Sequence, residues 1–348
     1  MNIAGDNANI QVTIATAGAI PIILKAMTAH TGNLVVIARG CGALANLATN
    51  AANKMAITSA GAIPIILKAV TSHACHAGVI QFGCAALANL AANDANNQVT
   101  IAAAGAIPVI LKAMTAHAGR AGVNEQGCQA LANLTKNGVN KVTIAAAEAI
   151  PVILKAMTTH ADHVGVNRLG CAAFGSLASN DANKITIAAA GAIPVILKAL
   201  TAHAGDANVN ESGCGALVNL TANAANKESI AAAGIIPVIL KALTAHAGHA
   251  GVNKYGFGVL ANLAANDANN QATIVAAGAI PVILKAMTAH AGDAGVNEQG
   301  CQALGNIVWS DPAIQQIAKV LSFSPTIPIL PTLAPLAAFL SQHQPFFL

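Results

Sequence analysis

Residues 96–137 read NNQVTIAAAGAIPVILKAMTAHAGRAGVNEQGCQALANLTKN, and this stretch decides the fold. Three helical segments fit inside it. The first is predicted at about 98–104 and the second at about 107–117. After the loop AGRAG, the third is predicted at about 123–136.

Particular residues mark where these helices begin and end. Asn96 or Asn97 can cap the first helix by accepting a backbone N–H bond,. Gly105 can end it in a left-handed conformation, which has no side-chain cost for glycine. Pro108 falls in the first turn of the second helix, where a missing N–H does no harm and φ is already set.

The stretch is one copy of a unit that recurs along the chain. An Ile-Pro dipeptide marks each copy, and consecutive copies are 43 or 44 residues apart. The marking prolines are Pro21, Pro64, Pro108, Pro151, Pro194, Pro237 and Pro281. Ile107, Ile110, Leu111 and Met114 form an apolar stripe at helical spacing that one unit cannot cover alone. Stacking the next unit on it buries the stripe, so the repeats predict a solenoid.

The unit resembles the armadillo repeat. The resemblance rests on the short first helix, the Gly-Ala-Ile-Pro turn, and a third helix that ends Ala-Leu-Ala-Asn-Leu-Ala, and it covers about residues 2–321. It implies an all-α, right-handed superhelix with three helices in each repeat. A HEAT-type array is the alternative, but it usually lacks the separate first helix.

The ends of the array differ from its middle. Residues 2–4 align with the end of a third helix, so the array is expected to be truncated at its N-terminus. Residues 311–321 match the first helix of an eighth unit. We expect the array to span 1–321 and the Pro-rich apolar tail 322–348 to be a cap or disordered.

Composition excludes several classes of protein. Of the 348 residues 55% are hydrophobic and 9% charged, and the net charge of +4 comes largely from one lysine per repeat. No clustered basic stripe suggests nucleic-acid binding, and no apolar run is long and uncharged enough for a membrane helix. Six of the seven cysteines follow the repeat, which favours a reduced, cytoplasmic location, with the nucleus as an alternative. They are Cys41, Cys84, Cys128, Cys171, Cys214 and Cys301.

One asparagine recurs near the end of the third helix and is replaced by Ser176 in the fourth copy. The ladder consists of Asn46, Asn89, Asn133, Asn219, Asn262 and Asn306. The resemblance implies that these side chains line a concave groove and hold the backbone of an extended peptide. An amide offers both a donor and an acceptor for this purpose. The alternative is that each asparagine bonds to loop carbonyls of the next repeat.

Variable positions share the helix face of the asparagines, because they are spaced by three, four and seven residues. The resemblance implies that they select the side chains of the partner. The first set of candidates consists of one arginine and six uncharged residues: Arg39, Phe82, Gln126, Gln129, Leu169, Tyr255 and Gln299. The charged neighbours are Glu125, Arg168, Glu211, Lys254 and Glu298. Phe82, Leu169 and Tyr255 are the candidate apolar anchors. The alternative is drift at solvent positions.

The tryptophans of the importin-α type are missing from this groove. They usually stand four residues before the asparagine, where this chain has Gly, Ala or Gln. Without them the groove cannot clamp lysine side chains through cation–π contacts. A receptor for nuclear localisation signals is therefore disfavoured, and a basic groove of the β-catenin type is not evident because the charges are mixed.

Two further ladders follow the repeat. The lysines are expected to be solvated: Lys25, Lys68, Lys112, Lys155, Lys198, Lys241 and Lys285. The histidines end the second helix, where a ring can bond its last carbonyls: His30, His73, His117, His160, His203, His246 and His290,. No metal site is predicted, since ligands spaced by whole repeats cannot converge on one ion. His73, Cys75 and His76 form a local cluster with no fourth ligand in sequence.

The sequence contains no catalytic motif, so we expect neither enzymatic activity nor a cofactor. The most favoured function is a scaffold that binds an extended peptide or helix of a protein partner in the groove. One alternative is the recognition arm of a larger enzyme, such as a ubiquitin ligase or kinase. Another is a structural array that associates end to end with further copies of itself.

Overall fold

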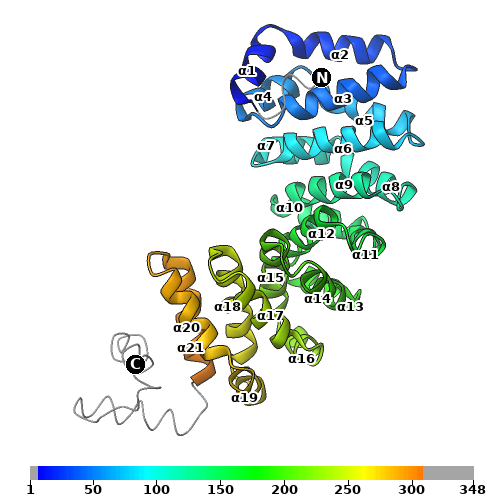
Figure 1. The fold of residues 1–348 in the computed structure, drawn as a ribbon. Helices are drawn as coiled ribbons and strands as arrows, with labels where there is room; N and C mark the ends of the chain where they lie inside the picture. The colour runs from blue at the N-terminus through cyan, green and yellow to red at the C-terminus, as the bar shows by residue number, and fades with distance from the viewer. Residues whose placement is uncertain (1–6, 309–348) are drawn as a thin grey trace, which may run out of the picture. The chain divides into compact units, whose positions relative to one another are not determined.

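The computed structural model describes residues 7–308, which form 21 helices and, within that range, no strand. Each of the seven copies contains the three helices that the sequence predicts (Figure 1). The prediction of an all-α repeat fold with three helices per unit is therefore confirmed. The truncated start at 2–4, the eighth unit at 311–321 and the tail at 322–348 lie outside the described residues.

The helices recur in the same order in every copy. The first helices are α1 (Ala8–Thr16), α4 (Ala51–Ser59), α7 (Ala95–Ala103), α10 (Gly138–Ala146), α13 (Asp181–Ala189), α16 (Ala224–Ala232) and α19 (Ala268–Ala276). The second are α2 (Ala19–Ala29), α5 (Ala62–Ser72), α8 (Ala106–Ala116), α11 (Ala149–Thr159), α14 (Ala192–Ala202), α17 (Ile235–Ala245) and α20 (Ala279–Ala289). The third are α3 (Leu34–Leu47), α6 (Ala77–Ala91), α9 (Ala121–Leu134), α12 (Val164–Leu177), α15 (Ala207–Thr221), α18 (Ala250–Ala264) and α21 (Ala294–Val308).

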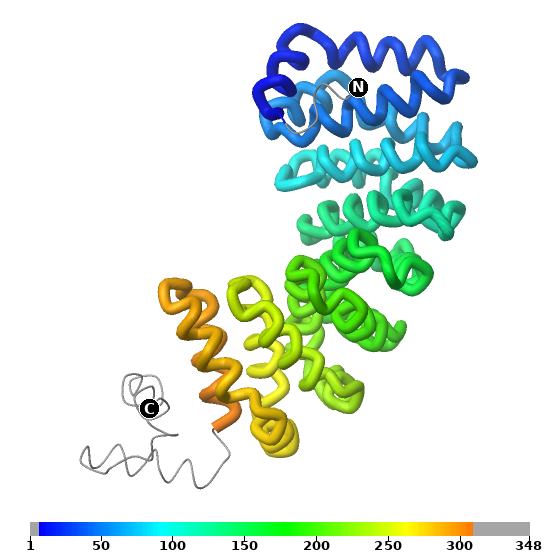
Figure 2. Tube along the Cα trace, viewed as in Figure 1, coloured from blue at the N-terminus to red at the C-terminus, as the bar shows by residue number. Residues whose placement is uncertain are grey.

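The chain divides into two compact units. Unit 1 is Met1–Ala233 and unit 2 is Gly234–Leu348, so the division falls between α16 and α17, inside the sixth copy. In unit 1 the third helices α3, α6, α9, α12 and α15 each pack on the next, and the second helices α2 to α14 do the same (Figure 2). In unit 2, α18 packs on α21 and α17 on α20.

The first helix of the quoted repeat begins earlier than predicted. Its cap is Asp94, whose carboxylate accepts the N–H of Asn97 at 2.9 Å. The prediction that Asn96 or Asn97 caps this helix was wrong. Asn97 lies inside α7, is 4% exposed, and donates its amide to the carbonyl oxygen of Leu90 at 3.1 Å. The buried amide thereby ties the first helix to the third helix of the preceding copy.

A left-handed residue joins the first helix to the second in every copy. Gly105 has φ +81°, as predicted, and the six glycines in this position all have positive φ. In the fourth copy the position holds Glu148, which adopts φ 62° with a side chain in place. The turn bends consecutive first and second helices of unit 1 by 71° to 77° from α1–α2 to α13–α14.

Stacking buries the predicted apolar stripe of the second helix. Ile107, Ile110, Leu111 and Met114 are at most 6% exposed. The third helix of the same copy approaches closely because Gly127 faces Met114, and a Cβ at that glycine would overlap the methionine side chain. Small residues therefore let helices come near enough for a core that is poor in aromatic side chains.

None of the described helices is, by itself, both long and apolar enough to cross a bilayer. The seven bent pairs of first and second helices reach that length and hydropathy only when taken together.

Candidate functional site

Four of the recurrent asparagines join a third helix to the one before it in the same unit. Asn89 donates its Nδ2 to the carbonyl oxygen of Ala45 at 2.9 Å, and Asn133 donates to Ala88 at 2.9 Å. Similar bonds run from Asn219 to Gly175 at 2.8 Å and, in unit 2, from Asn306 to Ala261 at 3.0 Å. The acceptor is a helix carbonyl of the preceding repeat and not a loop carbonyl of the next. The ladder therefore has a structural role in stacking.

Stacking leaves part of each amide unused. Asn89, Asn133 and Asn219 are half-buried, and within the described protein their Oδ1 atoms accept no hydrogen bond. Each Nδ2 also has a second N–H beyond the one that the preceding helix takes. The bond to the preceding helix fixes the orientation of the amide, so a donor and an acceptor are held in place on the third-helix face.

Ser176 takes the asparagine's place in the fourth copy. Its Oγ donates to the carbonyl oxygen of Thr135 at 3.0 Å, the same link between third helices that the amides make. A hydroxyl is therefore sufficient for stacking. It does not supply the amide's paired acceptor and second donor.

The variable residues of the third helices have different degrees of exposure. Phe82 is 39% exposed, and its ring covers Gly42 of α3, where an added Cβ would lie 3.5 Å from the ring. Leu169 is 6% exposed and is part of the core, so of the three candidate anchors it presents the least surface to a partner. The exposed candidates are Arg39, Lys254 and Glu298. The half-buried candidates are Gln126, Gln129, Arg168, Glu211, Tyr255, Gln299, Asn46 and Asn262.

Some charges on this face contact the next repeat. The carboxylate of Glu125 lies against Gly165 in the first turn of α12, where the positive end of the helix dipole favours it,. In unit 2 the ammonium of Lys254 lies near Gly295 of α21, 3.4 Å from where its Cβ would be. These side chains therefore have a packing role beside any role in selectivity.

The histidine ladder joins loops of successive repeats. The ring Nε2 of His117 donates to the carbonyl oxygen of Ala74 at 2.7 Å, and that of His160 donates to Ala118 at 2.8 Å. The acceptors belong to the loop of the preceding copy, so the prediction of a bond to the last carbonyls of the same helix was wrong. The helix end points each ring across the repeat boundary, and the period of the array supplies the partner.

Buried asparagines near the start of the third helix were not anticipated. Asn124 is 1% exposed and its Nδ2 donates to the carbonyl oxygens of His117, Ala118 and Arg120. Its counterparts Asn167, Asn210 and Asn297 donate in the same way. They brace the loop between second and third helices. The first two copies have Ile37 and Ile80 at this position, both buried.

The ladder lysines are solvated, as expected, and most of the ladder cysteines are buried. All seven ladder lysines are exposed. Five ladder cysteines are buried, Cys301 is half-buried and Cys75 is exposed. Burial raises the pKa of the Cys84, Cys128 and Cys214 thiols to about 12, so these groups stay protonated at neutral pH,.

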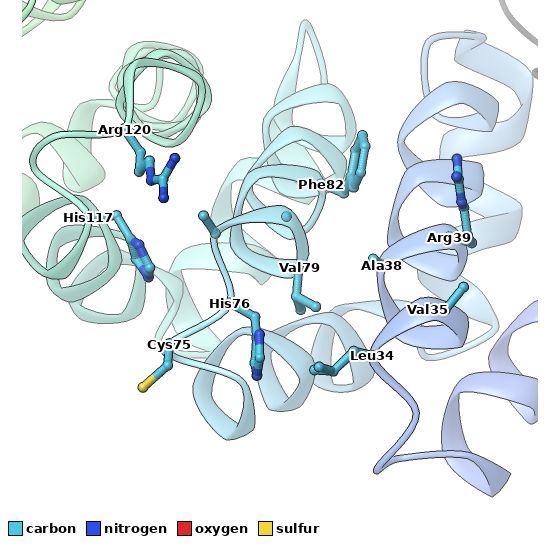
Figure 3. Close-up of a pocket in the computed structure, with 12 residues that line it drawn as sticks. Leu34, Val35, Ala38, Arg39, Cys75, His76, Val79, Phe82, His117 and Arg120 are labelled. Carbon is cyan, nitrogen blue, oxygen red and sulfur yellow. The ribbon is translucent and has the colours of Figure 1, made fainter.

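A pocket of about 560 Å³ opens beside Phe82 (Figure 3). One wall is α3, with Leu34, Val35 and Arg39. The other is the start of α6 with the loop before it, and His117 and Arg120 from the third copy complete the rim. In Figure 3 the ring of Phe82 lies between the side chains of Arg39 and Arg120.

The sequence predicts only part of this pocket. Arg39 and Phe82 are among the predicted groove residues. Cys75 and His76 stand out in the sequence only as part of the His73–Cys75–His76 cluster, which has no fourth metal ligand, and Arg120 is not among the predicted site residues.

The residue type that precedes the third helix could have signalled only the Arg120 side of the pocket, because His163 and His249 cap their helices whereas His76 does not. The side chain of that residue caps the third helix in five of the seven described copies. It is Asn or Asp in three of these copies and His in the other two. His76 and Arg120 make no such bond.

The described residues do not bring together a set of metal ligands. Among residues 7–308, no group of three His, Cys, Asp or Glu side chains could hold an ion. The His73–Cys75–His76 cluster fails because the His73 ring faces the Thr31 carbonyl oxygen at 2.7 Å and His76 stands 6.3 Å from it between ring centroids. The site therefore offers hydrogen bonding, apolar contact and charge.

Comparison with known proteins gives the repeat type. A family model described as LRRK2 ARM repeat matches residues 19–190, and no curated protein matches the chain. An engineered protein of known structure is 26% identical, with a TM-score of 0.77 over 93% of this chain and 79% of its own.

Two further structures share the fold at lower identity. One, reported for the interaction between cadherin and β-catenin, is 18% identical with a TM-score of 0.69, over 87% of this chain and 55% of its own. The other is a designed armadillo repeat protein in complex with the peptide (KR)4, 20% identical with a TM-score of 0.60, over 70% of this chain and 99% of its own. Three helices per copy, the left-handed corner and these likenesses agree: the chain has the armadillo type of repeat fold.

Proposed function

We propose that the chain is a non-catalytic scaffold that binds an extended segment of a partner protein along the third-helix face of unit 1. The observation that carries the proposal is the orientation of Asn89, Asn133 and Asn219. Each half-buried amide is fixed by a bond to the preceding helix and keeps a further donor and an acceptor. An extended backbone offers complementary N–H and C=O groups at regular intervals.

Neighbouring structures support the choice of a protein segment as the ligand. Two of them are a structure reported for the interaction between cadherin and β-catenin and a designed armadillo repeat protein in complex with a (KR)4 peptide. Phe82 and Arg39 on the same face would contribute apolar contact and charge. Binding through pre-oriented amides loses less conformational entropy than binding through mobile side chains.

The test separates binding from stacking. Peptides are selected from a random display library against the full chain, and their Kd values are then measured with two triple variants. In one variant Asn89, Asn133 and Asn219 become Ser, which keeps the stacking bond as Ser176 does. In the other they become Ala, which removes it.

We expect selected peptides to bind the serine variant at least about tenfold more weakly, which corresponds to roughly 1.4 kcal/mol, while its melting temperature stays close to that of the parent. Equal Kd values for the parent and the serine variant would mean that the amides serve stacking alone. The alanine variant reports the cost of losing both roles.

A further inference from the structure

The pocket beside Phe82 is lined by apolar side chains and by two arginines, Arg39 and Arg120. Leu34, Val35 and Val79 line it together with Phe82, and Val35 is 68% exposed. Its volume falls within the range of about 300–1,000 Å³ that is usual for ligand pockets. A bulky apolar side chain is the expected occupant of such a pocket, because its burial against the lining removes apolar surface from water.

The cations at this pocket have no counterion. Arg39 and Arg120 form no ion pair and donate no side-chain hydrogen bond within the described protein. No carboxylate lines the pocket. Residues 7–93 contain no Asp or Glu, so the first two copies carry only positive side-chain charge. A guanidinium with unused donors is suited to a carboxylate, which can accept two parallel bonds.

The two helices that begin at the pocket add to this preference. The side chains of His76 and Arg120, which precede α6 and α9, accept no hydrogen bond from the first turn. The corresponding Asn33 accepts two such bonds, and Asp206 and Asp293 accept one each. The first turns of α6 and α9 therefore lack the side-chain acceptor that neighbouring copies provide, and the helix dipoles favour negative charge there.

We propose that this pocket is the docking point for an acidic segment of the partner protein, which inserts a bulky apolar side chain beside Phe82 and presents flanking carboxylates to Arg39 and Arg120. The inference rests on the proposed function and names the class of segment that the face selects at its N-terminal end. Charge complementarity identifies the occupant: the rim is cationic, the lining is apolar, and both arginines lack partners.

Four labelled peptides serve as probes in anisotropy measurements with the full chain. They are GDEDLFDEDG, its basic counterpart GKKKLFKKKG, the uncharged GSGSLFSGSG and the acidic GDEDGSDEDG, which lacks the apolar pair. We expect GDEDLFDEDG to bind at least about tenfold more tightly than each of the others, and more weakly as salt screens the charges.

The key variant combines Arg39→Glu with Arg120→Asp. Its matched control, Lys68→Glu with Lys112→Asp, changes the net charge equally at two exposed positions on second helices. The first variant is expected to lose at least about tenfold in affinity for GDEDLFDEDG, and the control less than about twofold. Phe82→Gln introduces the residue that the third copy has at this position and is expected to weaken the same peptide severalfold.

Cys75 reports where the peptide binds. It lines the pocket and is exposed, whereas the other six cysteines are buried or half-buried. GDEDLFDEDG should slow alkylation of Cys75 by a maleimide, and GKKKLFKKKG should not. Unchanged alkylation at saturating peptide overturns the proposal, as does an equal loss of affinity in both charge variants.

Other occupants give different results. Phosphatidylserine vesicles that bind in an Arg39-dependent and Arg120-dependent manner, without peptide binding, would assign the surface to a membrane and overturn the proposal. A mass that doubles with concentration and reverts in the arginine variant would assign it to a second copy. If library peptides depend on the asparagines but not on the two arginines, the pocket proposal fails while the proposed function stands.

Discussion

Ser176 donates its hydroxyl to the carbonyl oxygen of Thr135 at 3.0 Å and so replaces, in the fourth repeat, the amide that links third helices elsewhere. Comparison of the fourth repeat with the others therefore shows which role requires asparagine. The stacking bond requires one donor. A preference for asparagine in the other copies requires a further reason, and a ligand for the remaining amide groups is the reason proposed here.

Single substitutions should separate the two roles by stability. Asn133→Ala leaves the Ala88 carbonyl oxygen without its donor and is expected to lower the free energy of unfolding by about 0.5–1.5 kcal/mol,. Asn133→Ser should lower it by much less. Urea unfolding followed by circular dichroism measures both. If alanine and serine destabilised the chain equally, the serine would not be making the bond seen at Ser176.

The fourth repeat also carries a residue under backbone strain. Glu148 has φ 62°, a conformation that the other copies assign to glycine, and its counterparts such as Gly105 have no atom near the place of a Cβ. Glu148→Gly is therefore expected to raise the free energy of unfolding by up to about 1 kcal/mol, since a left-handed residue with a Cβ costs roughly 1–2 kcal/mol and glycine loses more entropy on folding.

Gly105→Glu provides the reciprocal change for the same measurement. It should destabilise the third copy by about 1 kcal/mol. A gain from Gly105→Glu would show that the corner tolerates side chains without strain.

Local chemistry predicted the fold because each copy repeats the same signals. The Ile-Pro start of the second helix and the glycine before it fixed both helix boundaries near Gly105, and the apolar stripe from Ile107 to Met114 is buried as expected. The cap at Asp94 was missed because Asn97, three residues later, also has a side chain that can cap a helix. In the structure Asn97 is buried inside the helix and donates to the preceding copy instead. Sequence shows that a side chain can cap a helix, but not which helix face will be covered.

The site was less predictable because its contacts cross repeat boundaries. The acceptors of Asn89 and His117 lie in the preceding copy, 44 and 43 residues away. Spacing placed the asparagines on one face but could not say that one N–H of each is used in stacking. Leu169 occupies the same repeat position as Phe82 yet is 6% exposed, against 39% for Phe82, and repeat position alone does not predict that difference.

Arg120→Asp should have opposite effects on stability and on binding. Asp206 and Asp293 occupy this position in other copies and accept the N–H of Val209 and Val296 at 2.9 and 3.0 Å. An aspartate at residue 120 should cap α9 in the same way and raise the free energy of unfolding by about 1 kcal/mol. Thermal melts should therefore show a more stable protein that binds the acidic peptide less well. A variant that melts below the parent would contradict the capping argument.

The buried thiols make stability depend on alkaline pH. Burial raises the pKa of Cys84, Cys128 and Cys214 from 9.0 to about 12, because the thiolate would be desolvated,. Below pH 9 these thiols are protonated in both the folded and the unfolded chain, so their ionisation does not change the free energy of unfolding. Between pH 9 and about 12 the unfolded thiols ionise and the folded ones do not. The free energy of unfolding should fall there by up to roughly 1.4 kcal/mol per thiol and pH unit.

The measurement is urea unfolding between pH 8 and 11 under reducing conditions, compared with a variant in which Cys84, Cys128 and Cys214 are Ala. The variant starts less stable, because each substitution leaves a small cavity, but its stability should fall less steeply above pH 9. Alkylation provides an independent reading: at pH 8 the folded chain should react fastest at exposed Cys75, because the buried thiols are neither ionised nor accessible,. Parallel stability curves for the two proteins would show that the buried thiols do not control the alkaline transition.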